Sequence, residues 1–299
     1  MPAISVIMPV YDREHTVGRA VASVLAQDFA DWELIVVDDA SSDESGRVVE
    51  KLGDARIVLL RQAENRGGGA ARNRGIHAAR AEIVSFLDSD DVFLPRKLGF
   101  VTEYFARHPE IDVLLDSFEV VYPPERHKRP VARINPPLSD SQAIAAGIYA
   151  RRFSKATPAL SARRAALLKV GLFDESLKRR QDFDLVMRLT GACRCATTDR
   201  VLWTKHWAEA TITAQSDTFM AALLETCRRH PEYLSSPEHR VGVAKDLARH
   251  AARLAAKRRL GLLRADLDAF ARAHGVGATL QLLALGAVEN LKRAISGAR

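Results

Sequence analysis

Short apolar runs alternate with helical patterns along the first part of the chain. The runs are rich in Val and Ile and continuous rather than alternating, as expected of strands covered on both faces, and lie at 4–8, 33–37, 55–60 and 81–87. Apolar residues recur at helical spacing from Val17 to Leu25, and Thr16 can cap that helix. Ser41 or Ser42 can cap the next one. The alternation predicts an α/β fold with a mainly parallel sheet flanked by helices.

The pattern loosens after Leu94. A further strand is expected at 111–115, whereas 122–138 carries five prolines among basic residues, which predicts a basic surface loop or flap. A helical pattern covers 184–189, and a strand-like run ends at Trp203. Beyond about residue 216 the chain is rich in Ala, Leu and Arg, which predicts three or four helices. We therefore expect one domain over 1–215 and a basic α-helical C-terminal region over 216–299.

The charge of the chain is unevenly placed. Of 299 residues 47% are apolar and 27% charged, as in an ordinary globular protein, and the net charge is +7. The region 216–299 holds 14 Lys and Arg against 8 Asp and Glu. It could face nucleic acid, an anionic membrane surface or an acidic partner, or be a solvated helical face. Its last apolar stretch, 280–288, is too short to cross a bilayer and either packs in a core or lies on a membrane.

Targeting and cysteine signals point to the cytoplasm. No charged-then-apolar leader opens the chain. Three cysteines, Cys193, Cys195 and Cys227, are too few and too oddly spaced for a disulfide framework or a four-ligand zinc site. We expect a cytoplasmic protein without a nucleic-acid partner, and the basic C-terminal helices allow peripheral contact with the inner face of the cell membrane.

A cluster of carboxylates follows the apolar run that ends at Leu87. Asp88, Asp90 and Asp91 would repel one another unless a cation neutralises them. Mg²⁺ or Mn²⁺ suits such oxygen ligands and usually takes further ligands from phosphates, so the segment predicts a diphosphate site at the carboxyl end of a strand. The alternative interpretation is a helix N-cap and first turn before Leu94.

Four segments in this order at strand ends resemble the family 2 glycosyltransferases of the GT-A fold. They are Ser-Val-Ile-Met-Pro-Val-Tyr-Asp at 5–12, Leu-Ile-Val-Val-Asp-Asp-Ala-Ser at 34–41, Asn-Arg-Gly-Gly-Gly-Ala-Ala-Arg-Asn at 65–73 and Phe-Leu-Asp-Ser-Asp-Asp at 86–91. The resemblance extends to about residue 213. It implies a Rossmann-like GT-A domain and a nucleotide-sugar donor.

The resemblance also implies a nucleotide-binding set. Asp39 is similar to the family acid that accepts a hydrogen bond from a uracil-type ring N–H, although thymine and guanine offer the same donor. The glycine-rich turn permits close backbone approach to phosphates, and Arg72 is similar to the family arginine near the diphosphate. Asp38 would orient the turn after its strand. The nucleotide-binding residues expected in full are Pro9, Tyr11, Asp39, Asn65, Arg72, Asp88 and Ser89.

The metal and the catalytic base are likewise implied by the resemblance. Asp88 and Asp90 form an Asp-x-Asp signature for Mn²⁺ or Mg²⁺, and His206 resembles the family histidine that reaches back to the metal or diphosphate, although a lone histidine is often structural. Asp182 corresponds to the general base of an inverting transfer from a nucleotide sugar, preferably a UDP-sugar, to a hydroxyl of a glycan or lipid-linked acceptor. Gln181 replaces the usual Glu before it, and Asp184 is a second candidate base.

Two other functions remain open from the sequence. A nucleotidyltransferase that makes nucleotide sugars also places a metal and phosphates at parallel strand ends, although it would need a triphosphate-holding loop where this chain has Pro9-Val10-Tyr11. A non-catalytic nucleotide-binding module with a docking tail would accommodate Gln181.

Overall fold

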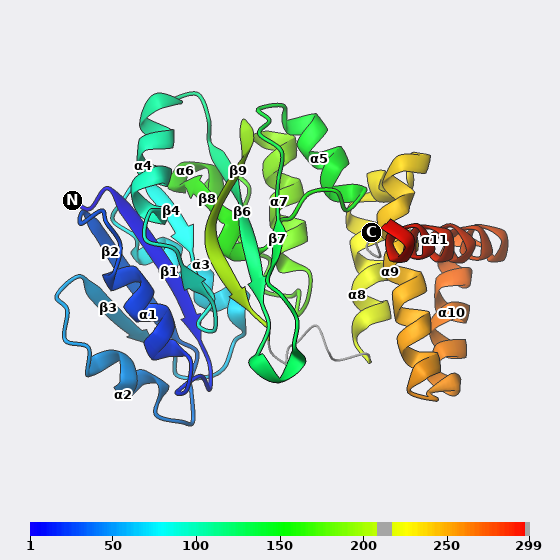
Figure 1. Ribbon diagram of the computed structural model, residues 1–299, viewed down its shortest axis with the longest axis horizontal. Coiled ribbons are helices and arrows are strands. Elements are labelled where there is room, and N and C mark those ends of the chain that lie inside the picture. Colours follow the sequence, from blue (N-terminus) through cyan, green and yellow to red (C-terminus); the bar gives the residue numbers. More distant parts are fainter. Residues whose placement is uncertain (208–216, 297–299) are drawn as a thin grey trace. The chain divides into compact units, whose positions relative to one another are not determined.

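A computed structural model describes residues 1–207 and 217–296 of the chain, with side chains up to residue 290. The chain forms two compact units (Figure 1). The first, here called the sheet unit, comprises Met1–Ile144 and Phe153–Ala208, and the second, the helical unit, comprises Ala145–Arg152 and Glu209–Arg299. The boundary expected between 215 and 216 lies outside the described residues.

Parallel strands form the N-terminal half of the sheet, in the order β3-β2-β1-β4 (Figure 1). The central strands are continuous apolar runs because both faces are covered, and β1 is buried along almost its whole length. This half contains β1 (Ile4–Val10), α1 (Val17–Leu25), β2 (Trp32–Asp38), α2 (Ser45–Glu50), β3 (Ile57–Arg61), α3 (Gly68–Ala78) and β4 (Ile83–Phe86). The four predicted strands of this half are confirmed.

The other half of the sheet is mixed, in the order β4-β8-β6-β9-β5. Among the described strands of this half only β6 and β9 run parallel, while β8 is antiparallel to both of its neighbours. The expectation of a mainly parallel sheet therefore holds for the first half. Its elements are β5 (Val92–Phe93), α4 (Lys97–Arg107), β6 (Val113–Val121), β7 (Val131–Arg133), α5 (Ser141–Tyr149), β8 (Leu160–Arg163), α6 (Arg164–Lys169), α7 (Gln181–Ala192) and β9 (Cys195–His206), with 3-10 turns η1 (Pro124–Arg126) and η2 (Thr157–Ala159).

The proline-rich segment is partly a strand. The prediction of a loop was wrong at β7, which pairs with β6 in antiparallel register. Its prolines do not interrupt this ladder because Pro130 stands just before the short strand, where a missing N–H removes no ladder bond.

The start of helix α2 differs from the sequence prediction. Helix α2 begins at Ser45 after Glu44, so neither Ser41 nor Ser42 caps it. Both serines instead bind Asp12: the Ser41 hydroxyl accepts the Asp12 N–H at 3.1 Å, and the Ser42 N–H donates to the Asp12 carboxylate at 2.8 Å. These bonds tie the loop after β1 to the loop after β2.

Helix α1 begins after Thr16 as predicted, but the Thr16 side chain makes no capping hydrogen bond. The alternative interpretation of the acidic cluster as a helix cap was wrong, since the next helix, α4, begins only at Lys97 and β5 stands between them. The acidic residues are therefore available for another role.

The helical unit contains α8 (Phe219–Arg229), η4 (Pro231–Leu234), α9 (Pro237–Ala256), α10 (Leu260–His274) and α11 (Val276–Ser296). Helices α9 and α11 approach closely at Gly286, where an added Cβ would lie 2.1 Å from the Ala244 carbonyl oxygen. Within 280–288 the prediction of core packing is confirmed at Leu282, which is buried, whereas Leu280 is 61% exposed. Each described helix is too short or too polar to cross a bilayer.

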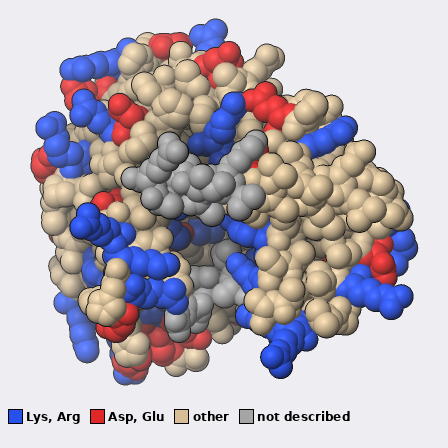
Figure 2. Space-filling model, turned by 45° about the vertical axis from the view of Figure 1, so that its right-hand side comes forward, with Lys and Arg blue, Asp and Glu red and all other residues tan. Residues whose placement is uncertain are grey.

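Charge is distributed over the surface in patches. Figure 2 shows one face, on which Lys and Arg side chains gather in several groups between broad uncharged areas, in keeping with the net charge of +7. The cysteines Cys193, Cys195 and Cys227 are free thiols, the latter two buried.

Candidate active site

The acidic cluster lies in the turn between β4 and β5. Carboxylate oxygens of Asp88, Asp90 and Asp91 lie within 4.8 Å of one another. Burial raises the pKa of Asp90, and the neighbouring charge of Asp88 raises it further. Burial also raises the pKa of Asp91 to about 8, even though Lys205 opposes the shift. Such crowding is the electrostatic condition that a bound cation would relieve.

Residues at the end of β9 face this turn. The Asp91 carboxylate accepts the backbone N–H of His206 at 3.0 Å, and the Lys205 Nζ lies 3.7 Å from the other Asp91 oxygen. Burial by itself lowers the pKa of Lys205, but the carboxylates around it raise the pKa above its ordinary value. In order of strength they are Asp91, Asp88, Asp90 and Asp182. The protonated form of Lys205 is thus stabilised by both the acidic cluster and Asp182, the predicted base.

His206 lies beside the acidic cluster without joining its tightest group. The group of possible metal ligands that lie within 4.8 Å of one another consists, in the described part of the chain, of Asp88, Asp90 and Asp91 and does not include His206. The ring is half-buried, and burial lowers its pKa together with the charge of Arg19, against the opposing effect of Asp90. The imidazole is therefore neutral at pH 7, which is the form that can bind a metal.

The glycine-rich turn leads directly into α3. Gly67 has a φ of 89°, which only glycine adopts without strain, and α3 begins at Gly68. From the first turns of this helix Arg72 forms an ion pair with Asp88, with 2.6 Å between Nη2 and Oδ1. The structure therefore brings together Arg72 and Asp88, both of which were predicted to bind the nucleotide.

Asp39 holds this turn in place. Its carboxylate accepts the N–H of Arg66 at 2.8 Å, the N–H of Gly67 at 2.7 Å and the side-chain amide of Gln62 at 2.5 Å. A carboxylate has about four lone-pair positions, so one remains for a further donor such as a ring N–H. Asp38 accepts the Ser41 N–H at 2.9 Å, which confirms that it orients its turn.

The other expected nucleotide contacts lie near the strand ends with different exposures. Pro9 lies near the end of β1, and Tyr11 follows it with 45% of its surface exposed. Asn65 is exposed ahead of the glycines, whereas Ser89 is buried inside the acidic turn. An accessible ring at Tyr11 is compatible with stacking on a base.

Asp182 lies at the start of α7, where Lys155 pairs with it. The Lys155 Nζ lies 2.6 Å from one Asp182 oxygen, and the Phe183 N–H donates to the other at 2.7 Å. Burial raises the pKa of Asp182, but the combined effect of Lys155, the backbone N–H and Arg180 lowers it overall. The carboxylate is therefore ionised at neutral pH, as a general base must be. No local pattern predicted Lys155, because it lies 27 residues from Asp182 along the chain.

Asp184, the second candidate base, has a structural contact. It is buried, and its carboxylate lies 2.7 Å from Arg188 one turn later, while Arg188 also donates to the carbonyls of Val170 and Leu172. This pair connects α7 to the preceding loop.

The start of α7 packs on the glycine-rich turn. A Cβ added at Gly69 would lie 2.9 Å from the Gln181 amide nitrogen, so a side chain at this position would displace Gln181. Asp182 follows Gln181 directly, and this contact sets the predicted base close to the turn that is expected to hold phosphate. A role for Gln181 in packing explains why an uncharged residue is accommodated there.

Comparisons with known proteins relate the chain to one enzyme family. The family model described as Glycosyl transferase family 2 matches residues 5–169. The UDP-Glc:alpha-D-GlcNAc-diphosphoundecaprenol beta-1,3-glucosyltransferase WfgD of Escherichia coli is 36% identical over 118 residues, which are 40% of this chain and 46% of that protein. The putative colanic acid biosynthesis glycosyl transferase WcaA of Escherichia coli (strain K12) is 30% identical over 193 residues, or 63% of this chain and 66% of that protein.

A solved structure shows the same fold. S. aureus TarS 1-349 in complex with UDP-GlcNAc superposes with a TM-score of 0.68 at 22% identity, covering 91% of this chain and 81% of that chain. This likeness confirms the predicted GT-A type of α/β fold. The chain spans less than two thirds of the length of the curated relatives described above.

Proposed function

The chain belongs to glycosyl transferase family 2, and from this premise we propose that it transfers a sugar from a UDP-sugar to a hydroxyl of a glycan or lipid-linked acceptor. The observation that carries the proposal is the position of Lys205, which lies 3.7 Å from Asp91 and whose pKa is raised by the acidic cluster and by Asp182 together. A donor site and a base at one sheet edge are what such a transfer requires. The family match favours this reaction over nucleotidyl transfer.

The donor is held by the elements around the glycine-rich turn. The first N–H groups of α3 and the Arg72 guanidinium offer hydrogen-bond donors to the diphosphate. The remaining acceptor position of Asp39 takes the ring N–H of uracil, while Tyr11 and Pro9 contact the base. Asn65 and Ser89 complete the nucleotide contacts.

A divalent cation fits the acidic cluster. One oxygen of Asp91 is buried without a hydrogen-bond partner among the described residues, and the crowded carboxylates are hard oxygen ligands. Asp88 and Asp90 would hold Mn²⁺ or Mg²⁺, with His206 beside them. When bound, the ion neutralises charge on the departing diphosphate.

The chemical step is a direct displacement with Asp182 as the base. An acceptor hydroxyl gives its proton to the Asp182 carboxylate as its oxygen forms a bond to the anomeric carbon. The bond from that carbon to the diphosphate oxygen breaks, and its electron pair leaves with UDP. Attack from the opposite face inverts the anomeric centre. Since a carboxylate is a weak base toward a hydroxyl, holding the two groups at hydrogen-bond distance supplies much of the rate.

The names of two relatives support the proposed class of acceptor. WfgD is named for a diphosphoundecaprenol substrate and WcaA for colanic acid biosynthesis. We infer that this chain acts on an envelope glycan or lipid-linked intermediate at the inner face of the membrane, with the basic helical unit providing peripheral contact.

The donor assignment is tested by thermal unfolding with a panel of nucleotide sugars and Mn²⁺. A ligand that binds the native state at 100 times its Kd raises stability by about 2.7 kcal/mol, so the true donor gives the largest shift. Asp90→Asn is expected to remove the metal-dependent part of this shift. Asp199→Asn, which changes an exposed aspartate on β9, is the matched control.

Product analysis separates the alternatives. Release of UDP with an acceptor supports glycosyl transfer. Release of pyrophosphate from a nucleoside triphosphate and a sugar phosphate would assign the chain to the nucleotidyltransferases, and donor binding without any turnover across acceptors would indicate a binding module.

A further inference from the structure

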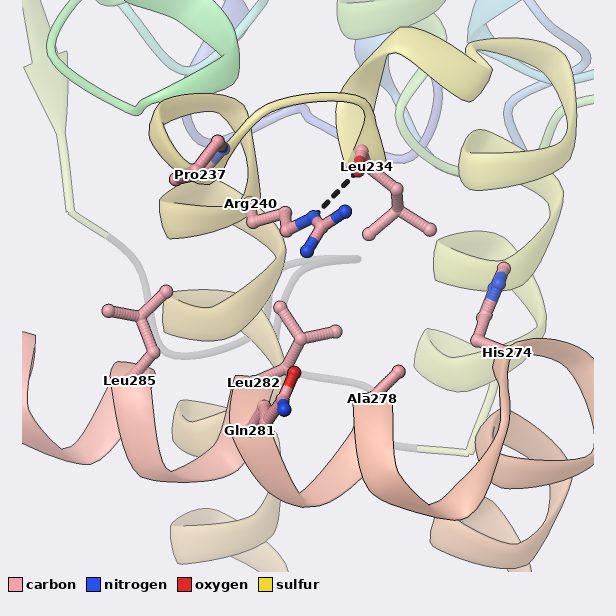
Figure 3. Close-up of a pocket in the computed structure, with 8 residues that line it drawn as sticks. All are labelled: Leu234, Pro237, Arg240, His274, Ala278, Gln281, Leu282 and Leu285. Atoms are coloured by element: carbon pink, nitrogen blue, oxygen red, sulfur yellow. Dashed lines mark hydrogen bonds between the residues drawn. The ribbon is translucent and has the colours of Figure 1, made fainter.

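An open groove lies within the helical unit, and its lining includes none of the residues used in the proposed transfer. Its volume is about 370 Å³, and residues of η4, α9, α10 and α11 line it (Figure 3). Binding pockets for small molecules commonly have volumes of about 300–1,000 Å³. The groove is therefore large enough for one extended chain or a small ligand.

The floor of the groove is apolar. Leu282, Leu285 and Ala278 reach it from α11, and Leu234 lies across from them (Figure 3). A ligand with a linear hydrocarbon portion would bury this surface, with a gain of about 25 cal/mol per Å².

One wall carries a guanidinium group that lacks a carboxylate partner. Arg240 on α9 donates from Nε to the Leu234 carbonyl at 2.7 Å, and Figure 3 shows its terminal nitrogens between Leu234 and Leu282. Within residues 1–207 and 217–290, no ion pair of Arg240 is formed. The neighbouring cationic residues differ, since Arg152 pairs with Glu238 and Lys245 with Glu289.

The opposite wall carries a second polar group. The His274 ring lies against Phe270, with 4.6 Å between ring centroids, and its Nε2 is buried without a hydrogen-bond partner in the described part of the chain. Burial lowers the pKa of this imidazole, so it is neutral at pH 7. A neutral Nε2–H can donate one hydrogen bond to a ligand oxygen.

We propose that this groove binds a single-chain amphiphile with a phosphate head group, its hydrocarbon chain along α11 and its phosphate at Arg240. Charge complementarity decides between occupants. An apolar helix or a neutral lipid would cover the guanidinium without an anionic partner, and burying an unpaired charge is unfavourable. A phosphate accepts parallel hydrogen bonds from the two terminal nitrogens of an arginine. This proposal does not depend on sugar transfer.

The test is a titration of the full chain with dodecyl phosphate below its critical micelle concentration, followed by calorimetry. We expect saturable binding that Arg240→Gln weakens at least tenfold, in keeping with the loss of a charge-assisted contact. Arg249→Gln is the matched control, because Arg249 lies on the same helix and also donates from Nε to a backbone carbonyl. Ala278→Trp, at an exposed lining position, should fill the groove and abolish binding without unfolding the chain.

Several results would overturn the proposal. Equal binding of dodecyltrimethylammonium would show a site without charge selection, and binding of inorganic phosphate alone would remove the hydrocarbon contribution. Equal weakening by Arg240→Gln and Arg249→Gln, or binding only to phosphatidylglycerol vesicles with both variants equally affected, would indicate diffuse surface attraction. A dimer in solution that Ala278→Trp dissociates, with no binding of dodecyl phosphate, would assign the groove to a second copy. In every case the UDP-release assay with the same variants reports separately on transfer.

Discussion

The two units of the chain differ in the contacts made by their most closely packed parts. In the sheet unit these contacts join charged side chains. Asp88, Asp91 and Lys205 lie together at one partly buried edge. Lys97 contacts Asp116, and neither side chain is exposed. The helical unit also buries a contact between ionisable side chains, His250 with Asp266, but its helices α9 and α11 meet at a glycine, Gly286. Variants in the sheet unit should therefore act through charge and variants in the helical unit through packing.

The largest effect is expected at Asp182. Replacing it by Asn keeps the shape but removes the proton acceptor, and we expect kcat to fall by about 10²–10⁴-fold with little change in UDP-sugar affinity. Steady-state rates and donor titration by calorimetry measure the two quantities. Asp199→Asn is the control of equal chemistry at an exposed site. Unchanged turnover would remove Asp182 from the role of base.

The next largest effect concerns the buried pair of the sheet unit. Lys97→Met leaves the Asp116 carboxyl buried without its ammonium partner, and removing one member of a buried pair costs about 3–5 kcal/mol of unfolding free energy. Burial raises the pKa of Asp116 to about 7 even with Lys97 present, so in the variant the pKa rises further.

The sign of the pH effect follows from that shift. When a carboxyl has a higher pKa in the folded protein than in the unfolded chain, the protein becomes less stable as the pH rises from the unfolded pKa to the folded pKa. The loss of unfolding free energy in Lys97→Met should therefore be greater at pH 8.5 than at pH 6. Urea unfolding at both values measures it. Lys51→Met, on the exposed end of α2, should change stability by less than about 0.5 kcal/mol. A double variant with Asp116→Leu should recover part of the loss, and no recovery would indicate a packing effect instead.

A smaller effect is expected where the helical unit depends on packing. Ala at Gly286 would place its Cβ 2.1 Å from the Ala244 carbonyl oxygen, so α9 and α11 must separate, at a cost of about 1–3 kcal/mol. Gly277 lies on the same helix with no atom within 4 Å of an added Cβ, and Ala there should be neutral or slightly stabilising. Thermal unfolding of the two variants compares them directly. A stable Gly286→Ala protein would show that the helices can shift apart at little cost.

Much of the fold was predictable because its signals are local. The apolar runs of β1, β2, β3 and β4 carry their own periodicity, and so do the helices that follow residue 216. The antiparallel pairing of β8, the short strand β7 and the assignment of Ala145–Arg152 to the helical unit depend on distant partners. Such pairings leave no pattern along a single stretch of chain.

The residues of the candidate site also differ in how far they could be predicted from the sequence. The acidic turn and the glycine-rich turn could be found from local residue types, and their contact through Arg72 and Asp88 agrees with that prediction. The pairing of Asp182 with Lys155, and the use of Asp39 to hold the glycine-rich turn, could not be found, because each joins segments far apart in the sequence. Charge pairs of this kind are specified by the fold rather than by spacing.

The smallest effect is expected from replacing Lys155, the residue that pairs with Asp182. Lys155 lowers the pKa of Asp182, so in Lys155→Met burial acts with less opposition and the pKa rises. Because the base must be ionised, the acidic limb of the kcat/KM profile should move to higher pH, while activity on the alkaline side is retained. Because the pKa of Asp182 is lower in the folded protein, its carboxylate also stabilises the fold at any pH above the pKa that it has in the unfolded chain. This contribution is lost as the pH falls through the folded pKa. The variant should therefore be less stable by roughly 1 kcal/mol at pH 7, with the difference shrinking in acid. Lys178→Met, at an exposed position before α7, is the matched control, and Lys155→Arg should restore the wild-type limb. An acidic limb that stays in place in Lys155→Met would mean that a group other than Asp182 takes the proton.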